Sequence, residues 1–416
     1  MVGHPVLRAS SMWRSVGIRG SSSRGFYRRA VGSATQRTSW VMSRLLIAVT
    51  LGALVLIAID RSDPGEAAGS EAAELAVAQA GPVPPALTSL SIAVTGEILP
   101  HPSIVEHAAR FGSQRGLAYD FAGLFLDVSP VIAAADLAIC HLEVPVAPPG
   151  RSLSGYPAFA IPAEVADGIH RTGWDRCSTA SNHTNDQGTA GIVATLDALD
   201  AAGVGHSGTA RTLEEASAPP LTDVGGVSVA HLSYTWGFNA TPPAEPWMAN
   251  MIDPDLILAD AAHARASGAA IVVVSVHWGD EYDTTGTTGQ RALAERLLAS
   301  PDVDLIVGHG PHVLQPIERF GEEYALLSVG NFVANQGSEH PNTYDGVVAT
   351  VTFSKGADGL FRAAPPVVEP TWYDRDAGRV RLVSSGLGDP GLGSIQSALE
   401  ASAERTGAII GSFVTG

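Results

Sequence analysis

Residues 271–281 read IVVVSVHWGDE, a run of β-favouring residues that ends in a histidine, a tryptophan and two carboxylates. A continuous run of this length, rich in valine and isoleucine, is typical of a strand that is buried on both faces of a sheet. In open α/β sheets, ligands bind beyond the carboxyl ends of such strands, where the loops converge. The segment therefore predicts a buried strand followed directly by a loop that carries functional side chains.

Similar β-rich runs recur from Ser89 onward and alternate with helix-like stretches, which predicts an α/β fold. Turn sequences at 223–227 and 319–323 predict hairpins within this alternation, so we expect a mixed sheet or two sheets. No repeat or break in composition divides residues 89–416, which we interpret as one domain. The strand-like runs are 91–94, 137–139, 227–232, 271–276, 305–307, 347–353 and 380–383, and the helix-like stretches are 121–134, 163–171, 189–202, 255–267, 288–299 and, more weakly, 393–405.

Potential metal ligands follow four of these strand-like runs and one further short run at 177–180. If the five strands are neighbours, their loops meet at one edge of the sheet. Each cluster alone has a simpler explanation. Glu97 could be a carboxylate at a helix start, and Asn182 and Asp186 could cap the helix that follows them. Their recurrence at five strand ends favours a common site. The clusters are Glu97; His141 with Glu143; Asn182, His183 and Asp186; His277, Asp280 and Glu281; and His309 with His312.

The residue types in these clusters indicate a metal site. Neutral imidazole and carboxylate groups suit Zn, Mn, Fe or Ni, and a mixed nitrogen and oxygen set is typical of hydrolytic sites. Two ions about 3.5–4 Å apart could clamp a transferring oxyanion. Asn182 would then be a neutral carbonyl ligand, and His183 could act as a general acid or orient the substrate. His231 lies inside a strand-like run and is expected to be structural, while His101 lacks this setting and receives no role.

The composition excludes several classes of protein. Of 416 residues, 45% are hydrophobic, and 45 Gly with 27 Pro are too few for collagen or a wholly disordered chain. The net charge is −17, although residues 1–59 hold eight Arg and no Asp or Glu, so the remainder is strongly acidic. An acidic folded part repels the phosphate backbone, so we expect no nucleic-acid partner. Cys140 and Cys177 are too few for a disulfide framework and are expected to be buried free thiols.

The amino-terminal region predicts a membrane segment. Residues 45–59, LLIAVTLGALVLIAI, are uncharged and follow a basic segment, as in a signal sequence or an uncleaved membrane anchor. Residues 1–44 are then a basic cytoplasmic or disordered N-terminus, with Met42 as an alternative start, and 60–88 form a flexible linker. This organisation predicts a single-pass cell-membrane protein with its folded domain outside the cytoplasmic membrane, or a secreted protein if the segment is cleaved.

At the ligand clusters the sequence resembles the CapA family, the capsule or poly-gamma-glutamate synthesis proteins, whose domain is similar to calcineurin-like metallophosphoesterases. The resemblance spans residues 94–336 and keeps the family's order of motifs. The matching segments are VTGEILPH (94–101), ADLAICHLEVPV (135–146), STASNHTNDQG (178–188), VSVHWGDEY (274–282), DLIVGHGPHVLQPIE (304–318) and LLSVGNFVANQ (326–336).

The resemblance implies a four-layer fold of two mixed sheets sandwiched between helices, with two divalent ions (Mn, Fe or Zn) at one rim. It implies that His183 is catalytic and that Glu281 and Asn331 bind substrate. The implied metal ligands are Glu97, His141, Glu143, Asn182, His277, His309 and His312.

Three positions depart from the family pattern. Glu97 stands where the family usually carries Asp, and its longer side chain must reach a metal differently or not at all. Leu99 stands where phosphoesterases place a His, and Gly310 where a His is common in the last motif.

Two functions remain open. The first is a metal-dependent hydrolase that cleaves a phosphoester, or less readily an amide, in a cell-envelope substrate. The second is a non-catalytic envelope component that binds or guides an anionic polyglutamate chain during synthesis or export. The implied partners are an anionic polymer or a phosphorylated small molecule, capsule-synthesis membrane proteins, and the cytoplasmic membrane through the N-terminal anchor.

Overall fold

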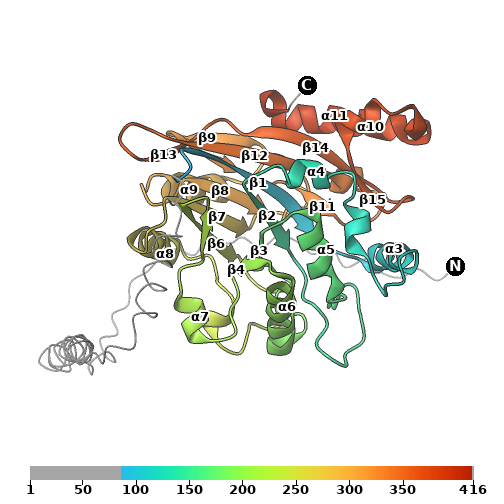
Figure 1. Ribbon diagram of the computed structural model, residues 1–416, viewed down its shortest axis with the longest axis horizontal. Helices are drawn as coiled ribbons and strands as arrows, with labels where there is room; N and C mark the ends of the chain where they lie inside the picture. The colour runs from blue at the N-terminus through green and yellow to red at the C-terminus, as the bar shows by residue number, and fades with distance from the viewer. Residues whose placement is uncertain (1–85, 415–416) are drawn as a thin grey trace, which may run out of the picture. The chain divides into compact units, whose positions relative to one another are not determined.

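The computed structural model describes residues 86–414 (Figure 1). The predicted N-terminus 1–44, the anchor 45–59 and most of the linker 60–88 lie outside the described residues. Within residues 86–414, no helix is both long and apolar enough to cross a membrane. Leu87, at the end of the predicted linker, already donates its backbone N–H to the carbonyl of Gly225 at 3.0 Å, so the folded part includes it.

Within residues 86–414, fifteen strands form two mixed sheets. The first sheet has nine strands in the order β15-β14-β12-β1-β2-β3-β4, with β11 paired to β1 and β13 paired to β12. Its strands are β1 (Ser89–Ile98), β2 (Leu137–Leu142), β3 (Arg176–Ser178), β4 (Gly205–Ser207), β11 (Asn331–Val333), β12 (Asp345–Lys355), β13 (Phe361–Ala363), β14 (Val367–Asp374) and β15 (Arg379–Leu382).

The second sheet has six strands in the order β5-β6-β7-β8-β10-β9. Its central strands are parallel, and each edge is closed by an antiparallel hairpin. Its strands are β5 (Leu221–Val224), β6 (Val227–Thr235), β7 (Ile271–His277), β8 (Leu305–His309), β9 (Ile317–Phe320) and β10 (Glu323–Leu326).

Helices cover the outer face of each sheet (Figure 1). The α-helices are α3 (Pro102–Ser113), α4 (Ser129–Ile132), α5 (Glu164–Thr172), α6 (Gly188–Ala202), α7 (Leu213–Ser217), α8 (Pro254–Ala266), α9 (Thr288–Leu298), α10 (Val383–Leu387) and α11 (Gln396–Ile410). The 3₁₀ helices are η1 (Phe121–Leu124), η2 (Pro246–Met248), η3 (Pro341–Tyr344), η4 (Pro390–Ile395) and η5 (Gly411–Phe413).

Three hydrophobic clusters separate the layers. One lies between the sheets and contains Ile92 of β1 and Val273 of β7. The next residue of each strand, Ala93 and Val274, belongs to an outer cluster beneath the helices. Because successive side chains of a strand point to opposite faces, both strands are buried on both sides. The α/β class and the two mixed sheets between helices are therefore confirmed.

Local predictions agree with the structure where the pattern is strong. Both hairpin turns are present, since β5 pairs with β6 and β9 with β10, each antiparallel. The predicted helix 121–134 is divided into η1 and α4. Helix α3 and strand β14 are among the elements that the sequence did not predict. Helix α3 begins with proline at its first turn and buries Ile104, Ala108 and Phe111 on one face. Strand β14 was hidden by Pro370, because proline lowers the propensity of a strand.

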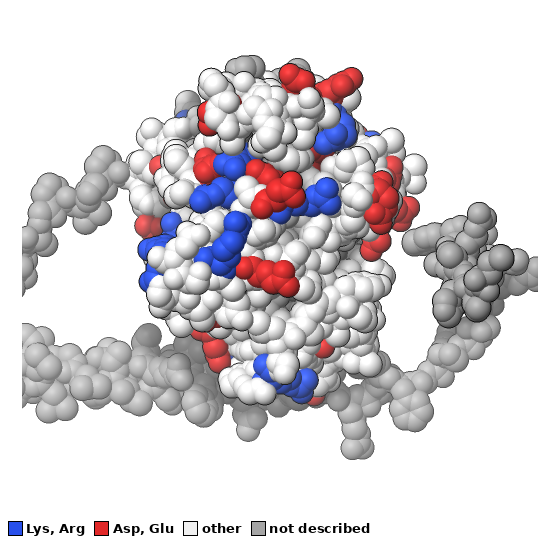
Figure 2. Space-filling view, turned by 90° about the vertical axis from the view of Figure 1, so that its right-hand side faces the viewer, with Lys and Arg blue, Asp and Glu red and all other residues white. Residues whose placement is uncertain are grey.

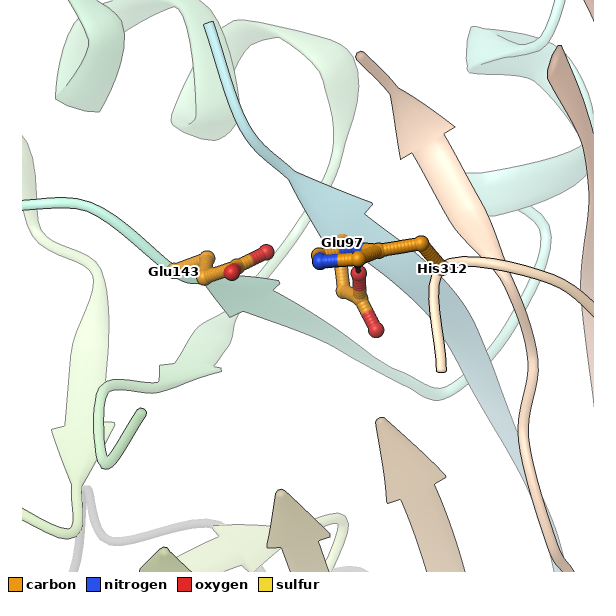
Figure 3. Close-up of side chains that lie close together, drawn as sticks. All are labelled: Glu97, Glu143 and His312. Atoms are coloured by element: carbon orange, nitrogen blue, oxygen red, sulfur yellow. Dashed lines mark hydrogen bonds and ion pairs between the residues drawn. The ribbon is translucent and has the colours of Figure 1, made fainter. Parts of the chain in front are cut away.

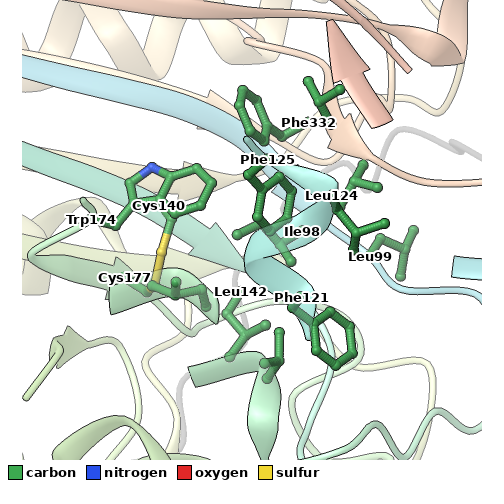
Figure 4. Packing of buried hydrophobic residues seen from close by; sticks show 14 of the residues in the cluster. Ile98, Leu99, Phe121, Leu124, Phe125, Cys140, Leu142, Trp174, Cys177 and Phe332 are labelled. Carbon is green, nitrogen blue, oxygen red and sulfur yellow. A yellow bond between two sulfur atoms is a disulfide. The ribbon is translucent and has the colours of Figure 1, made fainter. Parts of the chain in front are cut away.

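The expectation of two free thiols is wrong, because Cys140 and Cys177 form a disulfide (Figure 4). The two cysteines are direct partners in the parallel pairing of β2 with β3. Both are buried in the cluster beneath α5, next to Trp174 and Phe125. The cysteines are 37 residues apart in the sequence. Their contact depends on the strand register, which the sequence pattern does not reveal.

Candidate metal centre and active site

Strand register brings the ligand residues into two facing rows. In the first sheet, Glu97 of β1 pairs with Asn331 of β11 on one side and with His141 of β2 on the other. In the second sheet, His277 of β7 pairs with His309 of β8. The two rows meet, since Nε2 of His141 lies 3.1 Å from Nδ1 of His277. These strand ends place the five side chains at one rim of the sandwich.

Glu97 and His312 form a buried ion pair at this rim. Nδ1 of His312 donates to Oε2 of Glu97, and the other carboxylate oxygen accepts the backbone N–H of Gly310. Burial alone would raise the pKa of Glu97, but the positive charge and the hydrogen bond of His312 lower it. Burial would lower the pKa of His312, and the carboxylates of Glu97 and Glu143 raise it. Asn331 also faces Nδ1 of His312, with its amide oxygen at 3.2 Å.

Glu143 completes a compact group with this pair (Figure 3). Glu97, Glu143 and His312 each offer one ligand atom, and these atoms all lie within 4.8 Å of one another. The three side chains point toward one another from β1, from the end of β2 and from the loop after β8. Both oxygens of Glu143 are buried without a hydrogen-bond partner among the described residues, and burial raises its pKa well above the usual value.

This donor set fits a divalent cation. A buried polar group with no partner costs about 1–3 kcal/mol of folding free energy, and a charged carboxylate costs more. Protonation or a bound metal removes this cost. Two carboxylates and an imidazole are also the mixed oxygen and nitrogen ligands that Zn, Mn and Fe accept. Glu97 thus reaches the group in spite of its extra methylene.

A stack of neutral imidazoles lies beside the carboxylates. His141 stacks on His309 with ring centroids 4.2 Å apart, and its Nδ1 lies 2.8 Å from the hydroxyl of Ser178. Burial, followed by the neighbouring imidazoles, lowers the pKa of His141 and of His309 well below the usual value. The pKa of His277 is lowered in the same way. Nδ1 of His309 is buried without a hydrogen-bond partner in the described part, so it offers a lone pair.

The Asn-His motif places a second reactive group near the carboxylates. Nδ1 of His183 donates to Oδ2 of Asp186 at 2.7 Å, and Nε2 accepts from the amide of Asn239 at 3.3 Å. The carboxylate therefore fixes the ring and leaves Nε2 as the reactive atom. Asn182 precedes His183 in the sequence. The amide oxygen of Asn182 is buried without a hydrogen-bond partner among the described residues. The capping alternative for Asp186 is wrong, since helix α6 has no side-chain cap.

A cleft of about 840 Å³ opens onto this rim. His183, His312, Glu281 and Leu99 line it. Asn331 is instead buried, and its amide nitrogen donates to Gln336 and to the carbonyl of Thr343. The predicted substrate-binding residues thus differ in position, with Glu281 at the surface of the cleft and Asn331 behind His312.

Among the lining residues that the sequence did not predict, three have side chains with polar atoms near the rim: His101, Asn239 and Tyr282. His101 has its pKa lowered to about 4, mainly by burial, so it is neutral at pH 7. Asn239 comes from a loop without a recognisable motif. Tyr282 has a positive φ of 65°, as His312 does with 61°. Non-glycine residues in this backbone region cluster at functional sites. Tyr282 could have been predicted as a site residue, because it ends the HWGDEY motif. No sequence motif pointed to Asn239.

His231 is structural, as expected. It is buried inside the sandwich, and its two ring nitrogens contact the hydroxyls of Ser207 and Ser275 at 3.1 and 2.9 Å. Burial lowers its pKa well below the usual value.

The chain was compared with known proteins. The profile of the family described as "Bacterial capsule synthesis protein PGA_cap" matches residues 91–336. The chain is 29% identical over 260 residues to the capsule biosynthesis protein CapA of Bacillus anthracis, which covers 60% of each protein. It is 35% identical over 201 residues to the PGA biosynthesis protein CapA of Bacillus subtilis (strain 168), which covers 45% of this chain and 49% of that protein. The chain therefore spans about half to three fifths of the length of these relatives.

Among solved structures, a calcineurin-like phosphoesterase from Bacillus subtilis aligns over 76% of this chain and 98% of its own, with 12% identity and a TM-score of 0.40. The family profile covers more than half of the chain and includes every ligand cluster of the rim. The chain belongs to the bacterial capsule synthesis protein family PGA_cap.

Proposed function

We propose that this protein acts outside the cytoplasmic membrane in the biosynthesis or export of a capsule polymer of the poly-gamma-glutamate type, with a metal-dependent hydrolase-like site. The printed names of the Bacillus relatives, capsule biosynthesis and PGA biosynthesis, support the polymer. The observation that carries the hydrolase-like site is the convergence of Glu97, Glu143 and His312 beside the His183–Asp186 pair on one cleft.

In this proposal the two parts of the rim have separate tasks. A divalent transition metal held by Glu97, Glu143 and His312 would supply Lewis-acid polarisation of the bond to be cleaved. His183 would carry the proton for the leaving group at Nε2, because Asp186 occupies Nδ1. Asn239 holds Nε2 at the mouth of the cleft until substrate replaces it. A second ion would draw on Asn182 and the imidazoles of His277 and His309.

The disulfide supports the proposed location. Structural disulfides persist in oxidising compartments outside the cytoplasm and are rare within it. Cys140 and Cys177 lie at neighbouring positions in a buried sheet, where a disulfide is shielded from reductants. The membrane anchor at 45–59 stays a prediction from the sequence.

A second candidate function is a non-catalytic polymer-binding component. It is favoured by the Glu97–His312 pair, because each side chain neutralises the other without an ion. In this function the ion pair at the rim would stabilise the fold without a metal. The cleft would then bind the polymer and catalyse no reaction.

Metal content and turnover separate the two functions. The purified full-length protein, and variants His312→Asn and Glu143→Gln, would be dialysed against Mn, Fe and Zn and measured by elemental analysis. The hydrolase reading expects near-stoichiometric metal in the wild type and its loss in both variants. A panel of phosphomonoesters, phosphodiesters and gamma-glutamyl peptides would then be assayed with His183→Asn as the control. If the wild-type protein contains no metal after dialysis against these ions, the hydrolase function is contradicted and the polymer-binding function remains.

A further inference from the structure

An arginine strip crosses one face of this acidic protein. Residues 86–416 contain 16 Lys and Arg residues, and six of them lie on α3, the turn after α3, α5, β15 and the turn before β15. Figure 2 shows this face, where blue side chains gather in one region with red ones between and around them. The strip consists of Arg110, Arg115, Arg171, Arg375, Arg379 and Arg381.

The strip contains a pocket with more positive than negative charge. A cavity of about 240 Å³ is lined by Arg115, Arg171, Arg379 and a single carboxylate, Asp120. Asp120 accepts hydrogen bonds from both Arg115 and Arg171, at 2.7 and 3.0 Å. Arg171 also donates to Asp167 at 3.1 Å, outside the pocket. Asp120 is therefore shared by two of the lining guanidinium groups, and the third, Arg379, does not contact it.

Arg379 is the arginine with donor capacity to spare. Its Nη1 is buried without a hydrogen-bond partner among the described residues, and the closest carboxylate oxygen printed for it, from Asp127, is 3.8 Å away. Asp127 instead accepts from Arg381 at 2.6 Å. A buried guanidinium N–H without a partner is costly, so an anionic group entering this pocket gains a charge-assisted hydrogen bond.

A series of side-chain contacts connects the arginine strip with the metal cleft. Asn335 lines the cleft and accepts from the hydroxyl of Tyr344 at 3.3 Å. Arg375 stacks over the ring of Tyr344 with its guanidinium carbon 4.5 Å from the centroid. The carbonyl of Arg375 then accepts from His107, which accepts from Arg110 at 2.9 Å.

Phe111 connects this series of contacts to the pocket. The guanidinium carbons of Arg110 and Arg379 lie 4.9 and 5.0 Å from the ring centroid of Phe111, and Phe111 lines the pocket. Helix α3 runs between the two sites, with His101 at the cleft just before it and Phe111 near its end. Twelve helical residues extend about 18 Å, which sets the scale of the separation.

We propose that the arginine strip binds successive carboxylates of an extended anionic polymer, with one carboxylate seated in the pocket at Arg379 while another part of the same chain lies in the metal cleft. This inference rests on the proposed function, since it names how the polymer reaches that cleft. Linking several weak contacts on one chain raises the overall affinity far above that of a single carboxylate. The acidic remainder of the surface confines a polyanion to the strip.

The test compares polymer length and charge. Binding of fluorescent poly-gamma-glutamate to the full-length protein would be measured with free glutamate and a polyphosphate of similar charge as competitors. The variants are Arg379→Gln, Arg379→Lys and the double variant Arg115→Gln/Arg379→Gln. Arg362→Gln is the matched control, because it removes an exposed arginine of β13 that is paired with Asp358. Melting temperatures check that each variant is folded.

We expect Arg379→Gln to weaken polymer binding about tenfold, a loss of about 1.4 kcal/mol, and Arg379→Lys to recover part of it. Metal content should stay at the wild-type value, so failure of the metal site does not imitate this result. Equal binding by Arg379→Gln and wild type, or an equal loss in Arg362→Gln, overturns the proposal. Polyphosphate that competes as well as polyglutamate overturns the carboxylate assignment.

Discussion

Glu97 and His312 lie 215 positions apart in the sequence, yet Nδ1 of His312 donates to a carboxylate oxygen of Glu97 with both side chains buried. Glu97 comes from a central strand of the first sheet, and His312 from a loop that follows a strand of the second. The pair therefore joins the two sheets at the rim. Burial, more than the charges of this pair, raises the pKa of the neighbouring Glu143, whose oxygens have no hydrogen-bond partner in the described part of the chain.

Breaking this pair should destabilise the metal-free protein. Removing His312 leaves the buried carboxylate of Glu97 without a positive partner, so His312→Asn should cost about 3–5 kcal/mol. Asparagine is the substitution of choice because it tolerates the positive φ of 61° at this position. The double variant Glu97→Gln/His312→Asn should recover part of the loss. Urea denaturation with a chelator measures all three proteins, and additive losses in the double variant would show that the pair is not coupled.

Asp186 should act through His183 rather than through helix α6. Asp186→Asn removes the acceptor that fixes the Nδ1 proton, so it should lower turnover about a hundredfold on whichever substrate the panel identifies. It should also change the pH dependence of that turnover. A capping residue would instead affect stability alone, by about 1 kcal/mol. Histidine NMR of the variant, compared with Asp167→Asn on helix α5 as control, reports the tautomer of His183 directly.

The sequence was most informative where function and secondary structure share a short segment. His277 and His309 could be predicted because each ends a buried valine- or isoleucine-rich strand. Which of the ligand residues touch was not predictable, because that depends on strand register. The pairing of Glu97 with His141 includes an irregularity in β1 between Val94 and Glu97 that no local pattern encodes.

Residues outside the motifs were harder to find for a different reason. Asn239 reaches the site from a loop, and His101 stands before a helix whose apolar spacing was overlooked. The arginine strip was hidden by the strongly negative overall charge. Composition averages over the surface, whereas the fold gathers Arg110, Arg171 and Arg379 from three separate segments.

The disulfide should contribute measurably to stability. It closes a loop of 37 residues, for which the chain-entropy account gives about 3–4 kcal/mol. Cys140→Ser/Cys177→Ser should therefore lower the free energy of unfolding by about that amount. Thiol titration of the unreduced, fully unfolded protein should find no reactive cysteine. Two titratable thiols in protein from an oxidising compartment would contradict the disulfide.

Glu323 at the start of β10 predicts a pH-dependent contribution to stability. Burial first, and the charge of Asp304 second, raise its pKa from 4.5 to about 7. Because the folded pKa lies above the unfolded one, this stability is complete below about pH 4.5 and is lost as the pH rises through 7. Glu323→Gln should gain on the order of 1 kcal/mol over wild type at pH 8, after allowance for its partial exposure, and little at pH 4. Melting curves at both pH values test this, with Glu322→Gln as the exposed control.

Position 310 is a glycine that the backbone requires. Its φ is 110°, and a Cβ would lie 2.6 Å from the carbonyl oxygen of Trp278 and 3.3 Å from the ring of His277. Its N–H also donates to Glu97. Gly310→Ala should therefore destabilise the protein and lower its metal content.

Gly359 provides a matched control, since its φ is also positive, at 85°, but a Cβ there meets nothing within 4 Å. Both substitutions carry the backbone cost of about 1 kcal/mol for a non-glycine residue at positive φ. The difference between them isolates the close approach at the rim, which we expect to add about 1–3 kcal/mol because the contact is with rigid backbone. Equal losses of stability in Gly310→Ala and Gly359→Ala, with unchanged metal content, would show that close packing at position 310 does not shape the site.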